Sequence, residues 1–213
     1  KAKIAAGKTL LYREPPHYIT LGKELPAKAL DEILTDHAEV FTELKEYYKQ
    51  TSESDTTKIS FYEDTYSLYN LYRFAHYYEE AYGKYIWLKP GASLVIEHTE
   101  AMTVIDVNTG SVLKKKKQED TLFYQINREA AKEIARQLRL RNISGIIMID
   151  FINMKDTAQK EKLLSLLDSE CKKDRVHCNV IDMTALNLVE MTRSKVRKPL
   201  HEQIRFCMKN NRS

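Results

Sequence analysis

Hydrophobic and polar positions along the second half of the chain predict strands separated by helices. SLVIEH (93–98) and MTVIDVN (102–108) are rich in β-branched residues and only three residues apart, which predicts a hairpin. Apolar residues then recur at helical spacing over 127–141. The continuous apolar run IIMIDFI (146–152) is typical of a central strand buried on both faces, and HCNVIDM (177–183) predicts another strand. This order of elements predicts an α/β fold, a mixed sheet with crossover helices.

The first half of the chain has shorter and weaker patterns. LLYRE (10–14) is predicted to be extended, and LDEILTD (30–36) and KISFYE (58–63) are predicted strands. Apolar residues at helical spacing predict helices over 37–48 and 66–82. The tyrosines of 66–82 have the chemistry to stack on nucleic-acid bases, but their spacing favours core packing.

The change in pattern places a boundary between two subdomains near residue 84. Residues 1–84 form the first predicted subdomain, and residues 85–200 form the second. Residues 201–213 are predicted to be a basic C-terminal tail.

Composition describes a soluble, globular chain. Of its 213 residues, 43% are hydrophobic and 30% are charged. No apolar run approaches the ~20 residues that cross a bilayer, so we expect no membrane-spanning segment. The cysteines are few and odd in number (Cys171, Cys178 and Cys207), which indicates a reducing cytoplasm rather than a disulfide framework.

Charge is concentrated at the C-terminal end. Residues 190–213 hold seven Lys or Arg against two acids, a net charge of +5, whereas the whole chain carries +4. A polyanion is the natural partner for such a segment. On charge alone, a solvated basic tail explains the segment about as well.

Two buried-looking strands carry acids near their carboxyl ends. Asp106 and Asn108 are two residues apart and so project from one face of a strand, and Asp150 closes the next predicted strand. If the strands are neighbours, the carboxylates converge where open α/β sheets usually bind ligands. Two close acids favour a cation between them, and oxygen ligands favour Mg²⁺ or Mn²⁺ over zinc. Taken singly, each Asp is better explained as a turn residue, but the pair indicates a functional site.

Two sets of basic residues are candidates for contact with a polyanion. One set falls on a helical face; the other alternates in an extended stretch, a spacing that suits successive phosphates. They are Lys132, Arg136 and Arg139 in the first set, and Arg193, Lys195 and Arg197 in the second. A solvated outer face is the default explanation for the helical set. The six histidines have no metal-ligand spacing, and His98 is a weak candidate for the acidic site because it is predicted one strand away from Asp106.

Three blocks of the chain resemble the catalytic core of the bacterial ribonuclease E/G family. They are GASLVIEHTEAMTVIDVNTG (91–110), NREAAKEIARQLRLRNISGIIMIDFINM (127–154) and LVEMTR (188–193), in family order and spacing. Residues 91–200 resemble its DNase I-like subdomain. Residues 1–90 are similar to the end of its 5′-sensing region and its RNase H-like subdomain.

The resemblance implies a metal-dependent endoribonuclease that cleaves single-stranded RNA and leaves a 5′-phosphate, in rRNA processing and mRNA decay. The family's two magnesium-ligand aspartates fall on Asp106 and Asp150, and its asparagine falls on Asn108. Mn²⁺ is an expected substitute for Mg²⁺, and the basic residues are expected to position the RNA. The resemblance also allows a homo-oligomer of the full-length protein.

The chain departs from the family pattern in three places. The family's OB-fold RNA-binding module and 5′-monophosphate pocket do not precede these blocks, so we expect a fragment of a longer protein. Cys207 stands alone where many members carry a CPxC zinc link, so no zinc link is expected. Asn187 stands where a glycine usually precedes the LVEM motif. A non-catalytic RNA-binding module or scaffold is therefore the alternative, and a phosphoesterase acting on DNA is a third, weaker one.

Overall fold

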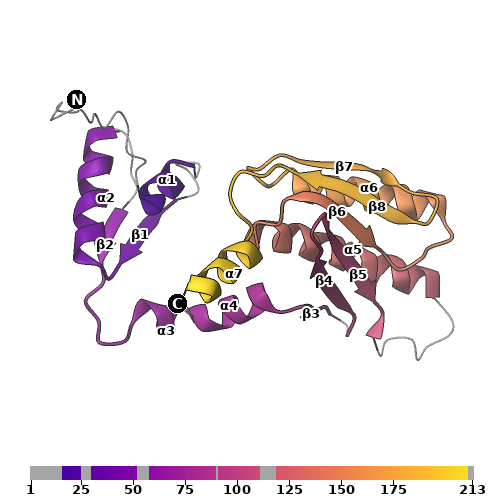
Figure 1. Cartoon of the computed structure of the whole chain (residues 1–213), viewed down its shortest axis with the longest axis horizontal. Coiled ribbons are helices and arrows are strands. Elements are labelled where there is room, and N and C mark those ends of the chain that lie inside the picture. Colours follow the sequence, from indigo (N-terminus) through magenta and orange to yellow (C-terminus); the bar gives the residue numbers. More distant parts are fainter. Residues whose placement is uncertain (1–15, 25–29, 52–57, 90, 111–118, 211–213) are drawn as a thin grey trace. The chain divides into compact units, whose positions relative to one another are not determined.

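The computed structural model describes residues 16–24, 30–51, 58–89, 91–110 and 119–210. The chain forms two compact units, Lys1–Ala75 and His76–Ser213 (Figure 1). Helices and strands alternate in both units, which confirms the predicted α/β class. The predicted extended segment 10–14 lies outside the described residues.

The first unit contains a two-stranded parallel sheet bridged by a helix. Its elements are helix α1 (His17–Glu24), strand β1 (Glu32–Thr35), helix α2 (Ala38–Thr51), strand β2 (Lys58–Phe61) and the short helix α3 (Leu68–Leu71). Leu44 of α2 is buried, and the ring of Phe41 lies 5.4 Å from that of Phe61. The predicted strands at 30–36 and 58–63 and the helix at 37–48 are thereby confirmed.

The single helix predicted over 66–82 is wrong in two respects. The segment forms α3 and a separate helix, α4 (Phe74–Tyr82), because Arg73 between them adopts a left-handed backbone with φ of 51°. The break prevents one apolar stripe from running the length of the segment. Its tyrosines are 48–55% exposed rather than packed in a core; they are Tyr66, Tyr69, Tyr72, Tyr77, Tyr78 and Tyr82.

The second unit is built on a six-stranded mixed sheet with the order β3-β4-β5-β6-β8-β7 (Figure 1). The strands are β3 (Tyr85–Trp87), β4 (Ser93–His98), β5 (Met102–Asn108), β6 (Gly145–Asp150), β7 (Cys178–Met183) and β8 (Leu188–Arg193). β5 and β6 are parallel, and every other neighbouring pair is antiparallel. The predicted mixed sheet and the β4-β5 hairpin are confirmed.

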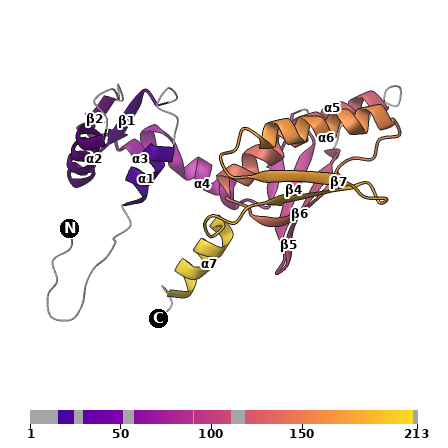
Figure 2. The same cartoon turned by 90° about the horizontal axis from the view of Figure 1, so that it is seen from above.

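Two long helices cover one face of this sheet. Helices α5 (Glu119–Leu140) and α6 (Thr157–Cys171) lie side by side on the same side of the strands (Figure 2). The apolar stripe of α5 is fully buried at Ala130 and Ile134, against Ile105 and Ile147 of the sheet. A last helix, α7 (Leu200–Asn210), follows β8.

The prediction that β6 is buried on both faces is wrong. Ile147 and Ile149, which point towards α5 and α6, are fully buried, but Ile146 on the other face is 48% exposed. The reason is that both crossover helices pack on the same side of the sheet. Neither of these helices covers the opposite face, and alternate residues of β5 and β6 point onto it.

The break between the two units falls after Ala75, nine residues before the boundary predicted from sequence. The C-terminal part of α4 is bonded to α5, where Gln137 Nε2 donates to Glu80 Oε1 over 3.0 Å. The structure does not test the assignment of 1–84 and 85–200 to the two family subdomains, which stays a prediction. No helix in the described part of the chain is both long and apolar enough to span a membrane.

Candidate metal centre on the open face of the sheet

The structure brings Asp106 and Asp150 side by side. β5 and β6 pair in parallel, and the last pair in their register is Asp106 with Asp150. Ile105 and Ile149 point towards the helices, and side chains alternate along a strand. The next residues, Asp106 and Asp150, therefore point onto the opposite, open face. Two acids 44 residues apart in sequence thus share one edge of the sheet, as expected if the strands were neighbours.

Asn108 orients one of these carboxylates. Its Nδ2 donates a hydrogen bond of 2.7 Å to Asp106 Oδ2. Just beyond, Gly110 has a φ of +57°, and a Cβ atom there would lie 2.1 Å from the Gly91 carbonyl oxygen. Only glycine permits this approach, which secures the chain as it leaves β5 directly after Asn108.

The electrostatics of the pair suit a cation. Burial raises the pKa of Asp150, and the negative charge of Asp106 raises it further. A cation between the two carboxylates would reverse this repulsion. In the described segments no group of three or more His, Cys, Asp or Glu is arranged to hold a metal. Two carboxylates with an open side fit Mg²⁺, which commonly takes one or two protein carboxylates and keeps several waters.

Asn127 on α5 supports the site from behind and was not singled out from sequence. Its side chain is fully buried, its Nδ2 donates to the Ile152 carbonyl oxygen over 2.8 Å, and its Oδ1 accepts from the Ile152 backbone N–H over 3.0 Å. This pair of bonds holds the chain two residues after Asp150. The sequence could have indicated Asn127, because it lies four residues before Ala131 and so on the same buried stripe of the helix. A polar side chain in such a position is costly unless it is hydrogen-bonded.

We expect Asn127→Leu to destabilise the protein by about 2–4 kcal/mol, because both backbone groups of Ile152 lose their buried partner. The free energy of unfolding in urea measures this loss. Asn179→Leu is the matched control: Asn179 is exposed on β7, and its change should stay within about 0.5 kcal/mol. Equal effects of the two substitutions would contradict a specific role for Asn127.

Comparison with known proteins shows the family of this chain. The model of the Ribonuclease E/G family matches residues 1–196. The chain belongs to the ribonuclease E/G family. Ribonuclease G of Haemophilus influenzae (strain ATCC 51907 / DSM 11121 / KW20 / Rd) is 36% identical over 193 residues, which cover 91% of this chain and 39% of that protein. Ribonuclease G of Escherichia coli (strain K12) is 37% identical over 171 residues, 80% of this chain and 35% of that protein.

A third relative extends the match along the chain. Ribonuclease E of Nostoc sp. (strain PCC 7120 / SAG 25.82 / UTEX 2576) is 30% identical over 205 residues, which cover 95% of this chain and 30% of that protein. The resemblance to the family found in the sequence is thereby confirmed. The chain spans about two fifths, or less, of the length of these relatives.

The basic helical set does not lie beside the carboxylates. Lys132, Arg136 and Arg139 are on α5, which covers the opposite face of the sheet. Lys132 pairs with Glu129 over 2.9 Å, and Arg136 pairs with Glu133 over 2.9 Å. An RNA contact by this set stays a prediction, and it would lie away from Asp106 and Asp150.

The second basic set does not share one side as predicted. Arg193 is buried, because β8 turns this residue towards the helices, and its Nε lies 2.9 Å from Asp174 Oδ2. Its Nη1 donates to Asn142 Oδ1 and to the Ile143 carbonyl oxygen, both over 2.9 Å. Arg193 therefore has a structural position and is not available to RNA. Lys195 is exposed and pairs with Glu202 over 3.3 Å, and Arg197 is half-buried.

His98 does not belong to the acidic site. It pairs with Thr103 near the start of β5, whereas Asp106 lies near the end of that strand. The two positions are at opposite ends of the sheet, since β4 and β5 run antiparallel.

Proposed function

We propose that this chain carries the catalytic centre of a Mg²⁺-dependent endoribonuclease that cleaves single-stranded RNA and leaves a 5′-phosphate, in RNA processing and decay. Membership of the ribonuclease E/G family supports the reaction class, as do relatives named Ribonuclease G and Ribonuclease E. The observation that carries the proposal is the direct pairing of Asp106 with Asp150 on an open sheet face.

Each residue of the site has a separate role in this proposal. Asp106 and Asp150 would hold Mg²⁺, with Mn²⁺ as a substitute. When bound, the ion supplies Lewis acidity, which activates a water molecule and offsets charge at the scissile phosphate. Asn108 orients the Asp106 carboxylate through its 2.7 Å bond, and Asn127 positions the chain that follows Asp150.

The residues that guide RNA lie, in this proposal, in the basic segment after β8. Residues 194–213 hold six Lys or Arg against one acid, Glu202, a net charge of +5. Lys195 is exposed, so it can meet a phosphate, and Arg197 follows it two residues later. Arg193 contributes indirectly by fixing the start of this segment through its buried ion pair with Asp174.

The test is cleavage of a single-stranded RNA oligonucleotide by the 213-residue chain, with Mg²⁺ and with EDTA. We expect cleavage only with Mg²⁺, and products that an exonuclease specific for 5′-phosphate ends degrades. DNA of the same sequence is the control substrate, and we expect it to remain intact. RNA binding with no metal-dependent cleavage would favour the non-catalytic module instead. Equal cleavage of the DNA would favour a general phosphoesterase.

Metal binding can be measured independently of activity. Mn²⁺ should selectively broaden the nuclear magnetic resonance signals of Asp106 and Asp150, because paramagnetic broadening falls steeply with distance. Broadening spread evenly over surface acids such as Asp182 would contradict a metal centre at this pair.

A further inference from the structure

A hollow lies in the His76–Ser213 unit, at the end of the sheet away from Asp106 and Asp150. Its volume is about 930 Å³, within the ~300–1,000 Å³ range of small-molecule sites. It is lined by the end of α4, the residue before β3, the end of β4, the residue that follows α5, and α7. The lining residues used below are Lys84, Ile96, His98, Arg141, His201 and Arg205, with Leu200 and Ile204 on the apolar wall.

Arg141 is a buried cation in this wall. It is 4% exposed, its Nε donates to Gln137 Oε1 over 2.6 Å, and its Nη2 donates to the Glu80 carbonyl oxygen over 2.9 Å. Both acceptors are neutral. Burial lowers the pKa of Arg141 to about 10, although the charge of Glu133 acts in the opposite direction. A buried charge is costly unless a counter-charge contacts it.

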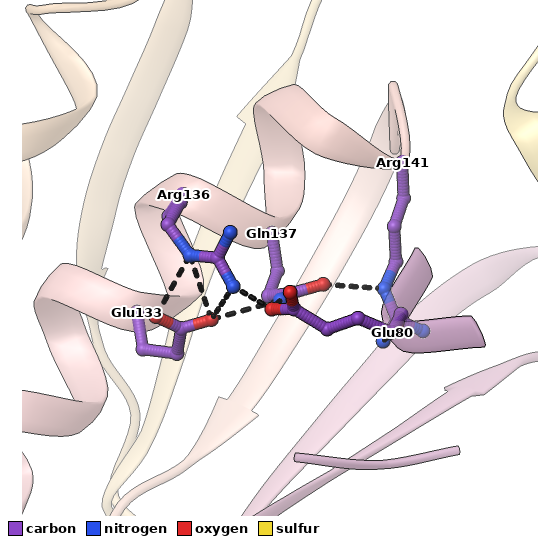
Figure 3. A network of polar contacts seen from close by, with 5 residues as sticks. All are labelled: Glu80, Glu133, Arg136, Gln137 and Arg141. Atoms are coloured by element: carbon purple, nitrogen blue, oxygen red, sulfur yellow. Dashed lines mark hydrogen bonds and ion pairs between the residues drawn. The ribbon is translucent and has the colours of Figure 1, made fainter. Parts of the chain in front are cut away.

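The nearby acids are already engaged by other cations. Figure 3 shows Glu80 and Glu133 directed at Arg136, with Arg141 bonded to Gln137 beside them. Glu97, which lines the hollow, pairs with Lys84, and Glu202, the neighbour of His201 in sequence, pairs with Lys195 over 3.3 Å. The hydrogen bonds of Arg141 within the described structure therefore leave its charge without a direct carboxylate contact.

A pair of histidine rings forms the next part of the wall. His98 of β4 and His201 of α7 are stacked, with ring centroids 3.8 Å apart. His98 Nδ1 lies 3.0 Å from Thr103 Oγ1. His201 Nδ1 is buried and, within the described structure, has no hydrogen-bond partner. A buried polar atom normally has a hydrogen-bond partner, and His201 is one of the residues that line the cavity.

Positive charges outnumber negative ones along the cavity: Lys84, Arg141 and Arg205 line it with the histidines, against one acid, Glu97. Burial lowers the pKa of His98 to about 4, and the positive charges of His201, Arg141 and Arg205 lower it further. Burial also lowers the pKa of His201. The negative charge of Glu202 acts in the opposite direction, and the positive charges of Arg205 and Lys195 lower the pKa again. Arg205 lines the hollow and is exposed, so its guanidinium can reach a ligand there.

We propose that this cavity binds a small phosphate monoester, with the phosphoryl group between Arg141, His201 and Arg205. A phosphate monoester carries up to two negative charges and several acceptor oxygens, which suits two guanidinium groups and an imidazole better than one carboxylate does. The organic body of the ligand lies against the apolar wall of Ile96, Leu200 and Ile204. The proposal does not depend on the endoribonuclease function, because the cavity and the acid pair occupy opposite ends of the sheet.

The test is a nuclear magnetic resonance titration of the 213-residue chain in phosphate-free buffer, with inorganic phosphate, AMP and adenosine as probes. We expect phosphate and AMP to shift the ring signals of His98 and His201 saturably and to compete with each other. Adenosine should bind at least about tenfold more weakly than AMP, because it lacks the charge-assisted bonds. Adenosine binding as tightly as AMP would overturn the proposal, and so would the absence of a saturable shift with AMP.

Variants locate the binding within the cavity. Arg205→Gln, at an exposed position that the fold does not need, should weaken AMP binding by about tenfold or more. His201→Phe keeps the stacked ring but removes Nδ1, and should also weaken binding. Lys162→Gln is the matched control, because it removes one exposed charge on α6 and should leave the affinity unchanged. Equal weakening by Lys162→Gln would show non-specific attraction and overturn the proposal.

One further outcome separates monoesters from RNA backbone. A short RNA with hydroxyl groups at both ends contains only phosphodiesters, so it should compete poorly with AMP for the His98 and His201 shifts. Competition as strong as that of AMP would identify a diester as the ligand and would overturn the monoester proposal.

Discussion

Asp106→Asn and Asp150→Asn are each expected to lower the rate of RNA cleavage by at least about a thousandfold. The change removes a negative metal ligand while keeping the size of the side chain, and the metal's contribution of several kcal/mol to the barrier is lost with it. Cleavage of a single-stranded oligonucleotide in Mg²⁺ measures the rate. Loss of Mn²⁺ broadening at the remaining partner gives a readout that needs no activity.

Asp182→Asn is the control for these two variants. Asp182 lies on the edge strand β7, where its Oδ1 accepts from the Met183 backbone N–H over 2.7 Å, a bond that asparagine can keep. We expect unchanged cleavage and an unchanged circular dichroism spectrum. Full cleavage activity in both Asp106→Asn and Asp150→Asn would remove the acid pair from the mechanism.

Arg193→Met is expected to destabilise the protein by about 3–5 kcal/mol, more than the loss of Asn127 or of any exposed ion pair. The side chains of Arg193 and Asp174 are only 3% and 4% exposed, so losing the guanidinium leaves a buried carboxylate without its counter-charge. The bonds from Nη1 to Asn142 and Ile143 are lost as well. The free energy of unfolding in urea measures the cost.

Two comparisons test this explanation. Lys195→Met breaks an exposed ion pair with Glu202 and should cost less than about 1 kcal/mol. Adding Asp174→Asn to Arg193→Met should recover part of the lost stability, because the second change removes the unpaired charge. No recovery in the double variant would show that packing, rather than charge, explains the loss.

The structure agrees with the sequence best where the signal is local. The β4-β5 hairpin was predictable because two β-branched runs are joined by three residues, which leaves few ways to connect them. The helix over 127–141 was predictable because its stripe repeats over several turns. The prediction of one helix over 66–82 was wrong because the spacing of apolar residues indicates only that the segment is amphipathic. It does not show that Arg73 adopts a left-handed backbone and breaks the helix.

The prediction that β6 is buried on both faces was wrong for a different reason. A run of apolar residues shows that a strand is hydrophobic, but it does not show on which side the crossover helices pack. Helices α5 and α6 lie on the same face of the sheet (Figure 2). For this reason Ile146 stays exposed while Ile147 is buried. The same arrangement opens the face on which Asp106 and Asp150 are found.

The sequence by itself determined β4, β5, α5, β6 and β7 of the second unit, the acids near the ends of two strands and the family resemblance, since these depend on patterns that are local in the chain; it did not predict β3, β8 or α7. Only the tertiary structure decided that Asp106 pairs with Asp150, that Arg193 turns inward to Asp174, and that Arg141, His98 and His201 meet around one cavity. The physical reason is that strand register, the side of a crossover and the burial of a charge depend on contacts between distant segments. A local pattern of residues carries no information about the partners that those segments find.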